Sequence, residues 1–185
     1  MKKGTIIIIA IIAILIIMGI SRYNSFAKMK VDIDNSWAEI ENQQKRRFDL
    51  IPNYVATVKG YAKHEEEVFT KVTKARASVG NASSRSEKID ANNQLTGALS
   101  RLLMVVERYP DLKANTNFIR LQDELAGTEN RLAVARRRYN ESVKNFNKQI
   151  VTFPNNILAG MFGFSKEPFY EVPETEKATP KVNFD

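Results

Sequence analysis

The chain contains no cysteine and a single histidine among its 185 residues. Without cysteine it has no disulfide bond, no thiolate metal ligand and no lipid attached through an N-terminal cysteine. A di-iron helical bundle needs two Glu-x-x-His pairs, but Tyr61 stands three positions before His64. The two-histidine zinc-protease helix also fails, because residue 68 is valine. We therefore interpret residues 64–67 as a solvated helix face.

Other patterns of catalysis are missing as well. No Gly-x-Ser-x-Gly elbow is present, and the eight glycines are scattered instead of forming a phosphate-binding loop. No stretch alternates apolar and polar residues in the manner of a strand. The sequence predicts a non-enzymatic protein with no catalytic residue, no metal site and no cofactor.

The net charge of +7 does not indicate nucleic-acid binding. Positive and negative residues are mixed, and the densest cluster, Arg136–Arg138, would fan across about 200° of a helix instead of facing one groove. From Pro154 onward three lysines face four glutamates and one aspartate. The basic excess therefore belongs to the earlier residues, where it favours anionic lipid headgroups.

The one long hydrophobic run extends from Gly4 to Ser21 without a charge. At 1.5 Å per residue a helix over it reaches about 27 Å, close to the roughly 30 Å hydrocarbon layer of a bilayer. A buried helix of a soluble domain and a cleaved signal peptide, with Ser25-Phe26-Ala27 as the cleavage site, are the alternatives. The run is long for a signal peptide and Arg22 precedes that site, so we expect residues 1–22 to be a retained single-pass anchor in a lipid bilayer.

The orientation of this anchor is nearly balanced. Lys2 and Lys3 stand on one side of the run, and Arg22, Lys28 and Lys30 stand on the other. The short Lys2-Lys3 flank resembles a signal-anchor and favours a body outside the cytoplasm, but long domains can translocate regardless of charge. The side of the membrane stays open.

Residues 23–153 have the spacing of amphipathic helices, because apolar residues recur every three or four positions. The three apolar stripes are Ile51, Val55, Val58, Ala62, Phe69, Val72 and Val79; Leu95, Leu99, Leu102, Val106 and Tyr109; and Phe118, Leu121, Leu125, Thr128, Leu132, Ala135, Tyr139, Val143, Phe146, Ile150 and Phe153. Helices of this kind must cover one another's apolar faces. The sequence predicts an all-α fold, with the transmembrane helix followed by an antiparallel, up-and-down helical bundle of the four-helix type.

Turn-forming residues separate the stripes. Residues 80–86 predict a hairpin with a serine cap before Glu87. Pro110 ends the second helix, and Asn115 or Asn117 caps the third. Pro52 has apolar neighbours and no turn chemistry, so we expect a kink or a short break there instead of a wide loop.

The chain changes character after Pro154. Residues 154–166 form a short apolar segment, and residues 167–185, rich in Pro, Glu, Lys and Thr, are expected to be disordered. We favour folding of the apolar segment back onto the bundle over contact with a bilayer or a neighbouring subunit. Its possible interface residues are Ile157, Leu158, Met161, Phe162 and Phe164.

Polar residues lie beside the core positions of the predicted bundle. Inward charges persist only when they are paired, so we expect a structural polar network, with a partner-binding groove as the alternative. The candidates for this network are Arg47, Asp49, Glu107, Glu129, Arg136 and Asn140. Trp37 lies about 24 Å of helix beyond the anchor, which favours a core position over a lipid contact.

Seven ordered segments resemble the LemA family. They are Tyr23-Asn24, Trp37, Arg46-Arg47-Phe48-Asp49-Leu50-Ile51-Pro52, Val58-Lys59-Gly60-Tyr61-Ala62, Glu107-Arg108-Tyr109-Pro110, Ala135-Arg136-Arg137-Arg138-Tyr139-Asn140 and Phe153-Pro154. The resemblance implies a single-pass protein of the bacterial inner or plasma membrane, with a four-helix-type domain and no established biochemical activity. It also implies an external amino terminus and a cytoplasmic body, opposite to the orientation that the charges favour.

These observations lead to three functional hypotheses. The first is a membrane-tethered scaffold that associates with itself or with another membrane protein. The second is an adaptor or sensor that regulates a membrane-associated partner enzyme. The third is a hydrolase with a buried carboxylate site at Glu107 or Glu129. The resemblance supplies no catalytic residues, which favours the first.

Overall fold

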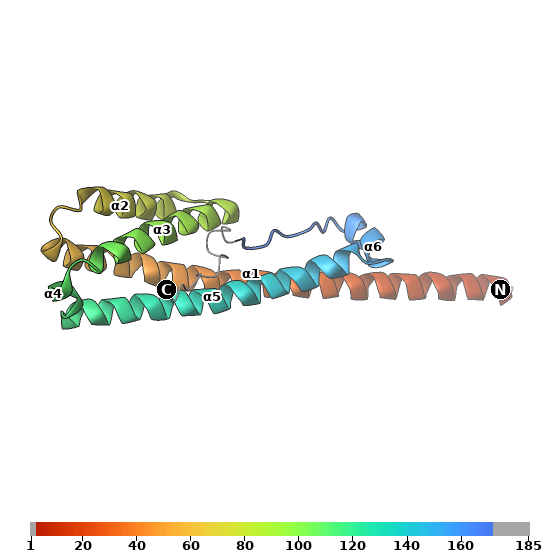
Figure 1. Ribbon diagram of the computed structural model, residues 1–185. Helices are drawn as coiled ribbons and strands as arrows, with labels where there is room; N and C mark the ends of the chain where they lie inside the picture. The colour runs from red at the N-terminus through yellow and green to blue at the C-terminus, as the bar shows by residue number, and fades with distance from the viewer. Residues whose placement is uncertain (1–2, 172–185) are drawn as a thin grey trace, which may run out of the picture. The chain divides into compact units, whose positions relative to one another are not determined.

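The computed structural model describes residues 3–171, and every regular element among them is an α-helix (Figure 1). This confirms the predicted all-α fold. The helices are α1 (Lys3–Tyr61), α2 (Glu66–Asn81), α3 (Arg85–Val106), α4 (Pro110–Lys113), α5 (Thr116–Val151) and α6 (Asn155–Met161). They form two compact units, and α1 and α5 contribute residues to both.

Unit 1 contains the chain up to Ile40 together with Ala135–Phe169. Within it, α1 and the C-terminal half of α5 run antiparallel, and α6 follows α5 (Figure 1). The Trp37 and Tyr139 rings meet edge to face with their centroids 5.4 Å apart. The predicted core position of Trp37 is therefore confirmed. The buried apolar residues of this unit are Phe26, Ile33, Trp37, Ile40, Ala135, Tyr139, Val143, Phe146, Ile150 and Ala159.

The apolar run at the start of α1 has no protein cover. Its large side chains between Ile6 and Ile20 are exposed, so it is not the core helix of a soluble domain. Within residues 3–171, α1 is the one helix long and apolar enough to cross a membrane, although a signal sequence meets the same criterion. The helix continues from this run through Arg22 into the core of unit 1.

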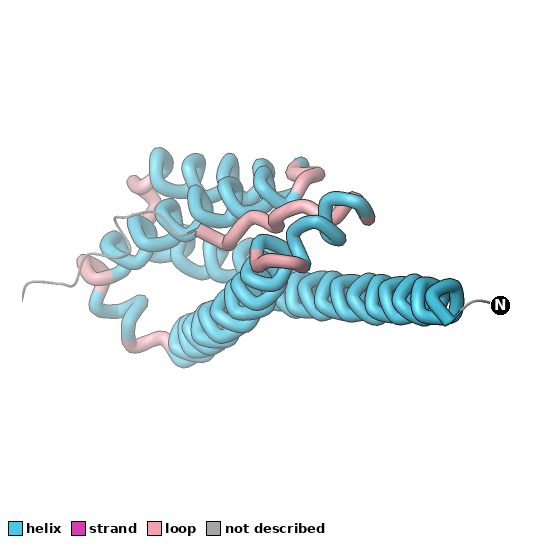
Figure 2. The backbone as a smooth tube through the Cα atoms, turned by 90° about the vertical axis from the view of Figure 1, so that its right-hand side faces the viewer, coloured by secondary structure: helices cyan, strands magenta, loops and turns pink. Residues whose placement is uncertain are grey.

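Unit 2 contains Glu41–Val134 and the chain from Tyr170 onward. Its helical parts are the end of α1, α2, α3, the short α4 and the beginning of α5, which are joined by short loops (Figure 2). The four long segments alternate in direction, as an up-and-down bundle requires. Their core contains Ile51, Tyr54, Val58, Ala62, Phe69, Val72, Ala75, Leu95, Ala98, Leu99, Leu102, Val105, Val106, Leu112, Phe118 and Leu125.

One predicted helix is two helices in the structure. The stripe from Ile51 to Val79 belongs to α1 up to Tyr61 and to α2 from Glu66. A turn separates them, in which the Glu65 amide donates to the Ala62 carbonyl at 3.3 Å. The apolar spacing continues from one side of this turn to the other, and no proline or paired glycine occurs in it. The periodicity alone therefore predicted one continuous helix. The acidic residues of the first turn of α2 were the available signal, because carboxylates favour a helix N-terminus.

Both predicted helix caps are present. Ser84 caps α3 in a capping box with Glu87, and the Asn115 side chain accepts a hydrogen bond from the Phe118 amide at 3.0 Å. The break expected at Pro52 is absent, whereas the helix expected to end at Pro110 does end before it. Pro52 lies inside α1 without a break, flanked by the buried Ile51 and Tyr54, whose packing holds the helix on both sides. Pro110 ends the turn after α3 and also opens α4, since the first helical turn needs no amide donor.

The segment after α6 begins with residues that are bonded to unit 1. The Asn147 side chain donates to the Glu167 carbonyl at 2.8 Å and accepts from the Glu167 amide at 2.9 Å, and Lys30 pairs with the Glu167 carboxylate. The Tyr139 hydroxyl donates to the Pro168 carbonyl at 2.9 Å. Of the predicted disordered tail, 167–185, these first residues are therefore held in place, and residues 172–185 lie outside the described part of the chain.

The Ser84 cap generates a test of helix α3. We expect Ser84→Ala to lower the free energy of unfolding by about 1 kcal/mol, because the Glu87 amide loses its acceptor. Ser86→Ala, at an exposed position of the same helix, is the control and should have little effect. Thermal unfolding of the detergent-solubilised protein, followed by circular dichroism, measures both.

The same cap should depend on pH. Hydrogen bonds from Ser83 and Ser84 lower the pKa of Glu87. A carboxylate with a lowered folded-state pKa stabilises the fold above its unfolded pKa, and this contribution is lost as pH falls through the folded value. Glu87→Gln keeps these donors and removes the charge, so its difference in stability from wild type should shrink in acid, where the wild-type carboxylate becomes protonated. Equal stability of wild type and Ser84→Ala at neutral pH would contradict the assigned cap.

Candidate functional site

A groove of about 310 Å³ lies between α3 and α5 in unit 2 and contains two of the predicted polar residues, Arg47 and Glu129. Helix α1 supplies Arg47 to the groove, and the neighbouring helices supply its walls. Its lining residues are Arg47, Thr96, Leu99, Ser100, Leu103, Gln122, Leu125, Ala126, Glu129 and Asn130. The groove thus combines apolar walls with one charged pair.

Among residues 3–171, Arg47 is one of the largest fully buried side chains, at 2% exposure. Its Nη1 lies 3.0 Å from the Glu129 Oε2, and its Nη2 donates to the Thr96 Oγ1 at 2.9 Å. The Thr96 hydroxyl in turn donates to the Asn92 carbonyl at 3.0 Å. A buried guanidinium is tolerated only with such compensation, so this chain of contacts ties α1 to α3 and α5.

The groove places leucine side chains beside the Arg47–Glu129 pair. Leu99 and Leu125 form buried parts of its wall, and Leu103 is more exposed at its edge. The guanidinium is a permanent donor and the paired Glu129 carboxylate is already engaged. Such an arrangement can hold apolar side chains beside a polar anchor, but it offers no base poised next to a nucleophile.

Two of the predicted network residues lie at the surface instead. Asp49 pairs with Lys45 at 2.6 Å, one helical turn away on the exposed face of α1. It stands two residues after Arg47, about 200° around the helix, and therefore points away from the groove. Glu107 follows the last residue of α3, is 67% exposed at its side chain and pairs with Lys113 at 2.6 Å. The structure does not bring Glu107 and Glu129 into one carboxylate site.

The remaining two predicted network residues belong to unit 1. Arg136 is buried, and Asn140 is partly buried one turn later on α5. The outer arginines of the triplet differ from Arg136, since Arg137 and Arg138 are exposed and Arg138 donates to the Glu39 carboxylate at 2.9 Å. One arginine therefore points inward and two point outward, because three successive residues of a helix span about 200° around its axis.

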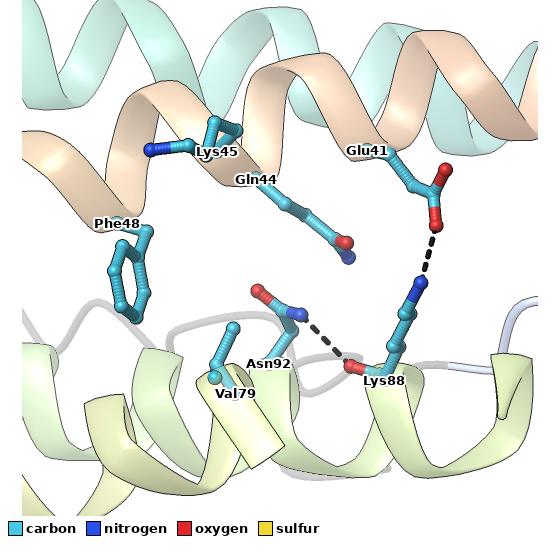
Figure 3. Close-up of a pocket in the computed structure, with 8 residues that line it drawn as sticks. Glu41, Gln44, Lys45, Phe48, Val79, Lys88 and Asn92 are labelled. Carbon is cyan, nitrogen blue, oxygen red and sulfur yellow. Dashed lines mark hydrogen bonds and ion pairs between the residues drawn. The ribbon is translucent and has the colours of Figure 1, made fainter. Parts of the chain in front are cut away.

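Sequence reasoning missed a second groove, of about 280 Å³, where α1 faces α2 and α3 in unit 2 (Figure 3). Lys88 and Glu41 form an ion pair at 2.6 Å across it. The buried side chains of Gln44 and Asn92 point into the same space. The Gln44 Nε2 and the Asn92 Oδ1 have no hydrogen-bond partner among residues 3–171.

A water molecule can accept from the Gln44 amide and donate to the Asn92 oxygen at the same time, because it has two donor and two acceptor sites. The Asn92 amide nitrogen is fixed by its bond to the Lys88 carbonyl at 2.8 Å, so its oxygen faces the groove. On one side the Phe48 ring stacks under the Arg76 guanidinium, 3.8 Å from the ring centroid. Gln44 and Asn92 interrupt apolar positions of their helices, and this interruption was the signal available in the sequence.

The predicted interface residues after Pro154 divide into two sets. Phe162 and Phe164 contact the aromatic ring of Tyr23, at 5.2 and 5.7 Å between centroids. Leu158 is partly buried. Ile157 and Met161, in contrast, are exposed at 55% and 74%. The segment thus packs on unit 1 through one side and leaves apolar side chains uncovered on the other.

Metal-binding geometry is not present in the described part of the chain. Among residues 3–171 no three His, Asp or Glu side chains are grouped so that they could hold an ion. Burial raises the pKa of Tyr54 to about 12. A phenol with a raised pKa is a poorer base and a poorer nucleophile at neutral pH, so Tyr54 supports packing and not catalysis.

Comparison with known proteins places these features in a family. The model of the LemA family matches residues 36–184. The chain is 25% identical to Protein LemA of Metamycoplasma hominis over 167 residues, covering 90% of this chain and 76% of that protein. It is 28% identical over 204 residues to Magnetosome protein MamQ 2 of Paramagnetospirillum magneticum, covering 95% and 74%. It is also 25% identical over 216 residues to Magnetosome protein MamQ of Magnetospirillum gryphiswaldense, covering 98% and 79%.

The buried ion pair generates an asymmetric prediction. Glu129→Ala should destabilise the protein by about 3 kcal/mol, because it leaves the Arg47 guanidinium buried without its carboxylate. Arg47→Met should cost clearly less, since the 39% exposed Glu129 side chain can turn to water. Thermal unfolding of the two variants and the double variant in detergent measures the difference. Equal losses would show that the guanidinium is not the constrained partner.

The Tyr54 hydroxyl generates a second prediction. It is buried without a hydrogen-bond partner among the described residues, while its ring packs 5.3 Å from the Phe118 ring. We expect Tyr54→Phe to keep the ring contact, remove an unsatisfied polar group and raise the melting temperature.

Alkaline pH tests the same residue through its ionisation. With a folded pKa of about 12 against an ordinary value near 10, Tyr54 stays neutral in the folded protein while it ionises in the unfolded chain, so the free energy of unfolding falls as pH rises from about 10 toward 12. Tyr54→Phe should therefore lose less stability than wild type between pH 9 and about 11.5. Parallel losses in the two proteins, measured by unfolding at each pH, would contradict this assignment.

Proposed function

The chain belongs to the LemA family, and from this membership and its structure we propose that it is a non-enzymatic, membrane-anchored scaffold whose helical body associates with further copies of itself. The observation that carries the proposal is helix α1. It runs unbroken from an exposed apolar run into the cores of both compact units. A protein built on its own anchor in this way is suited to hold a helical surface at a membrane.

The polar groups of the described residues support a structural role. Glu129 neutralises Arg47, Asp49 and Glu107 pair with lysines at the surface, and Glu107 does not line the groove that contains Glu129. Buried polar groups that satisfy one another fix the register of helices, and they leave little free chemistry. This supports the scaffold over the hydrolase hypothesis.

The groove between α3 and α5 supports association. Its apolar wall ends in Leu103, which is 37% exposed, and Met104 beside it is 64% exposed. A helix from a second copy that covered these side chains would remove apolar surface from water, and the groove supplies the polar anchor for register. The names of two relatives tie those proteins to the magnetosome.

We propose the bacterial cell membrane, inner or plasma, as the location, with residues 1–22 as the anchor. The proposal does not depend on which side of the membrane the helical body lies. The continuous α1 also supports the alternative of an adaptor or sensor. A helix without a loop between the apolar run and the core transmits a shift or rotation of the anchor directly to the body. That role requires a stable complex with a different membrane protein.

The mass of the complex extracted in mild detergent separates the two roles. We expect a multiple of the chain mass, and we expect Leu103→Arg to weaken self-association about ten-fold by placing a charge in the groove wall. Ile119→Arg, at an exposed apolar position that does not line the groove, is the matched control. Native mass spectrometry and analytical ultracentrifugation give both quantities.

Each outcome has a distinct meaning. A stable mass that contains a second protein would favour the adaptor. A lone monomer at every concentration, with no crosslinked product, would remove the scaffold hypothesis. A homo-oligomer that Leu103→Arg and Ile119→Arg leave unchanged would keep self-association and exclude this groove as its surface.

A further inference from the structure

Helix α6 has an unusual distribution of side chains. Asn155 and Ala159 are buried against unit 1, whereas Ile157 and Met161 are exposed. Since two residues correspond to about 200° of a helix, the exposed pair points almost directly away from the buried pair. Phe153, one turn before Ile157, is 76% exposed as well. The apolar face of this helix is therefore its outer face, and a polar asparagine lies on its inner face.

The position of α6 on unit 1 is fixed by aromatic contacts with the start of the core. Phe162 meets Tyr23 edge to face at 5.2 Å between centroids, and Phe164 contacts Phe26 at 5.4 Å and Phe146 at 6.2 Å. Figure 1 shows α6 beside α1 where the apolar run passes into the core. Tyr23 stands two residues after Ser21, so α6 is attached about 3 Å of helix beyond the end of the run.

The turn after α6 is built to place Phe164 on these rings. Gly163 has a φ of 75°, the left-handed conformation that ends many helices. The Phe164 amide donates to the Ala159 carbonyl at 2.9 Å, and the Gly163 amide donates to the Gly160 carbonyl at 3.3 Å. These two bonds form a Schellman motif, which ends α6 and sets the direction in which the chain continues to Phe164.

The composition around α6 suits a bilayer interface. No charged residue occurs from Val151 to Ser165. Exposed Arg22 and Lys28 follow the apolar run along α1, and exposed Lys166 follows Phe164 by two residues, so these parts of the chain carry positive charges that anionic headgroups attract. Each interfacial layer of a bilayer is about 5 to 8 Å thick, so a helix attached about 3 Å beyond the hydrocarbon boundary lies within it.

We propose that α6, together with Phe153, inserts its outward apolar side chains into the interfacial layer of the bilayer that α1 enters. This rests on the membrane anchorage proposed above. Interfacial helices bury an apolar face about 5 to 10 Å into the boundary between headgroups and acyl chains, and large apolar side chains such as Phe, Ile and Met supply that face. The contact is a second attachment beside the anchor, and it restricts rotation of α1 about its own axis.

Because the chain has no cysteine, single-cysteine variants can report the depth of chosen positions. We would label Ile157→Cys and Met161→Cys with an environment-sensitive fluorophore in the full chain, reconstituted in phosphatidylcholine–phosphatidylglycerol vesicles. Lipids carrying a nitroxide near the headgroup should quench both labels about two-fold or more. Ile12→Cys, within the apolar run, reports the anchor itself with acyl-chain nitroxides.

Glu141→Cys is the matched control in the same unit. It is exposed, and its neighbour Ser142 lies 3.2 Å from Ser36, which stands about 22 Å of helix beyond Ser21. A label at Glu141→Cys should therefore show no quenching. Circular dichroism melting of each variant checks that the fold is retained, and the two independent α6 positions guard against a local effect of one label.

The outcomes separate this inference from the anchorage on which it rests. Quenching at Ile12→Cys, with none at either α6 position, would leave the anchor in place and overturn the interfacial contact. Absence of quenching at Ile12→Cys as well would overturn the anchorage itself. Unquenched α6 labels, together with crosslinking of the same unlabelled cysteines between two chains, would assign this patch to self-association and contradict the bilayer contact.

Discussion

The structure depends on a single constraint, which is that α1 must satisfy different surroundings along one uninterrupted helix. Its first turns are apolar on every side and uncovered by protein, while its later turns are apolar on one face only. The later face supplies Phe26, Ile33, Trp37 and Ile40 to unit 1 and Ile51, Tyr54 and Val58 to unit 2. The rest of the chain is arranged to cover that face, with α5 contributing the opposite wall in both units.

The periodicity of the sequence predicted most of this arrangement, because helices that bury one face repeat apolar residues every three or four positions. The caps at Ser84 and Asn115 were predictable for the same local reason, since their side chains bond amides within the next turn. The turn after Tyr61 was missed because it preserves the apolar spacing. Of the kink or short break expected at Pro52, the break does not occur, because burial of the neighbouring residues outweighs one lost hydrogen bond.

The polar residues were harder to place. Arg47 and Glu129 meet, yet Asp49 and Glu107, chosen by the same proximity to core positions, are exposed. A charged residue beside an apolar stripe lies near the boundary between core and surface. A rotation of the helix about its axis by less than 100°, the angle between successive residues, is enough to bury or expose that side chain. The amides of Gln44 and Asn92 were overlooked for a related reason, because a groove arises from the mutual positions of helices and not from any single periodicity.

The unbroken passage of α1 from its apolar run into the core has an evolutionary consequence for the chain's length. Adding or removing one residue between Ser21 and Phe26 would turn everything downstream by about 100° and shift it by about 1.5 Å relative to the run. Substitutions in this short stretch change only a side chain. Insertions and deletions there rotate and shift the rest of α1, and the helices packed on it, relative to the apolar run. Selection should therefore conserve the number of residues in this stretch more strictly than their identity.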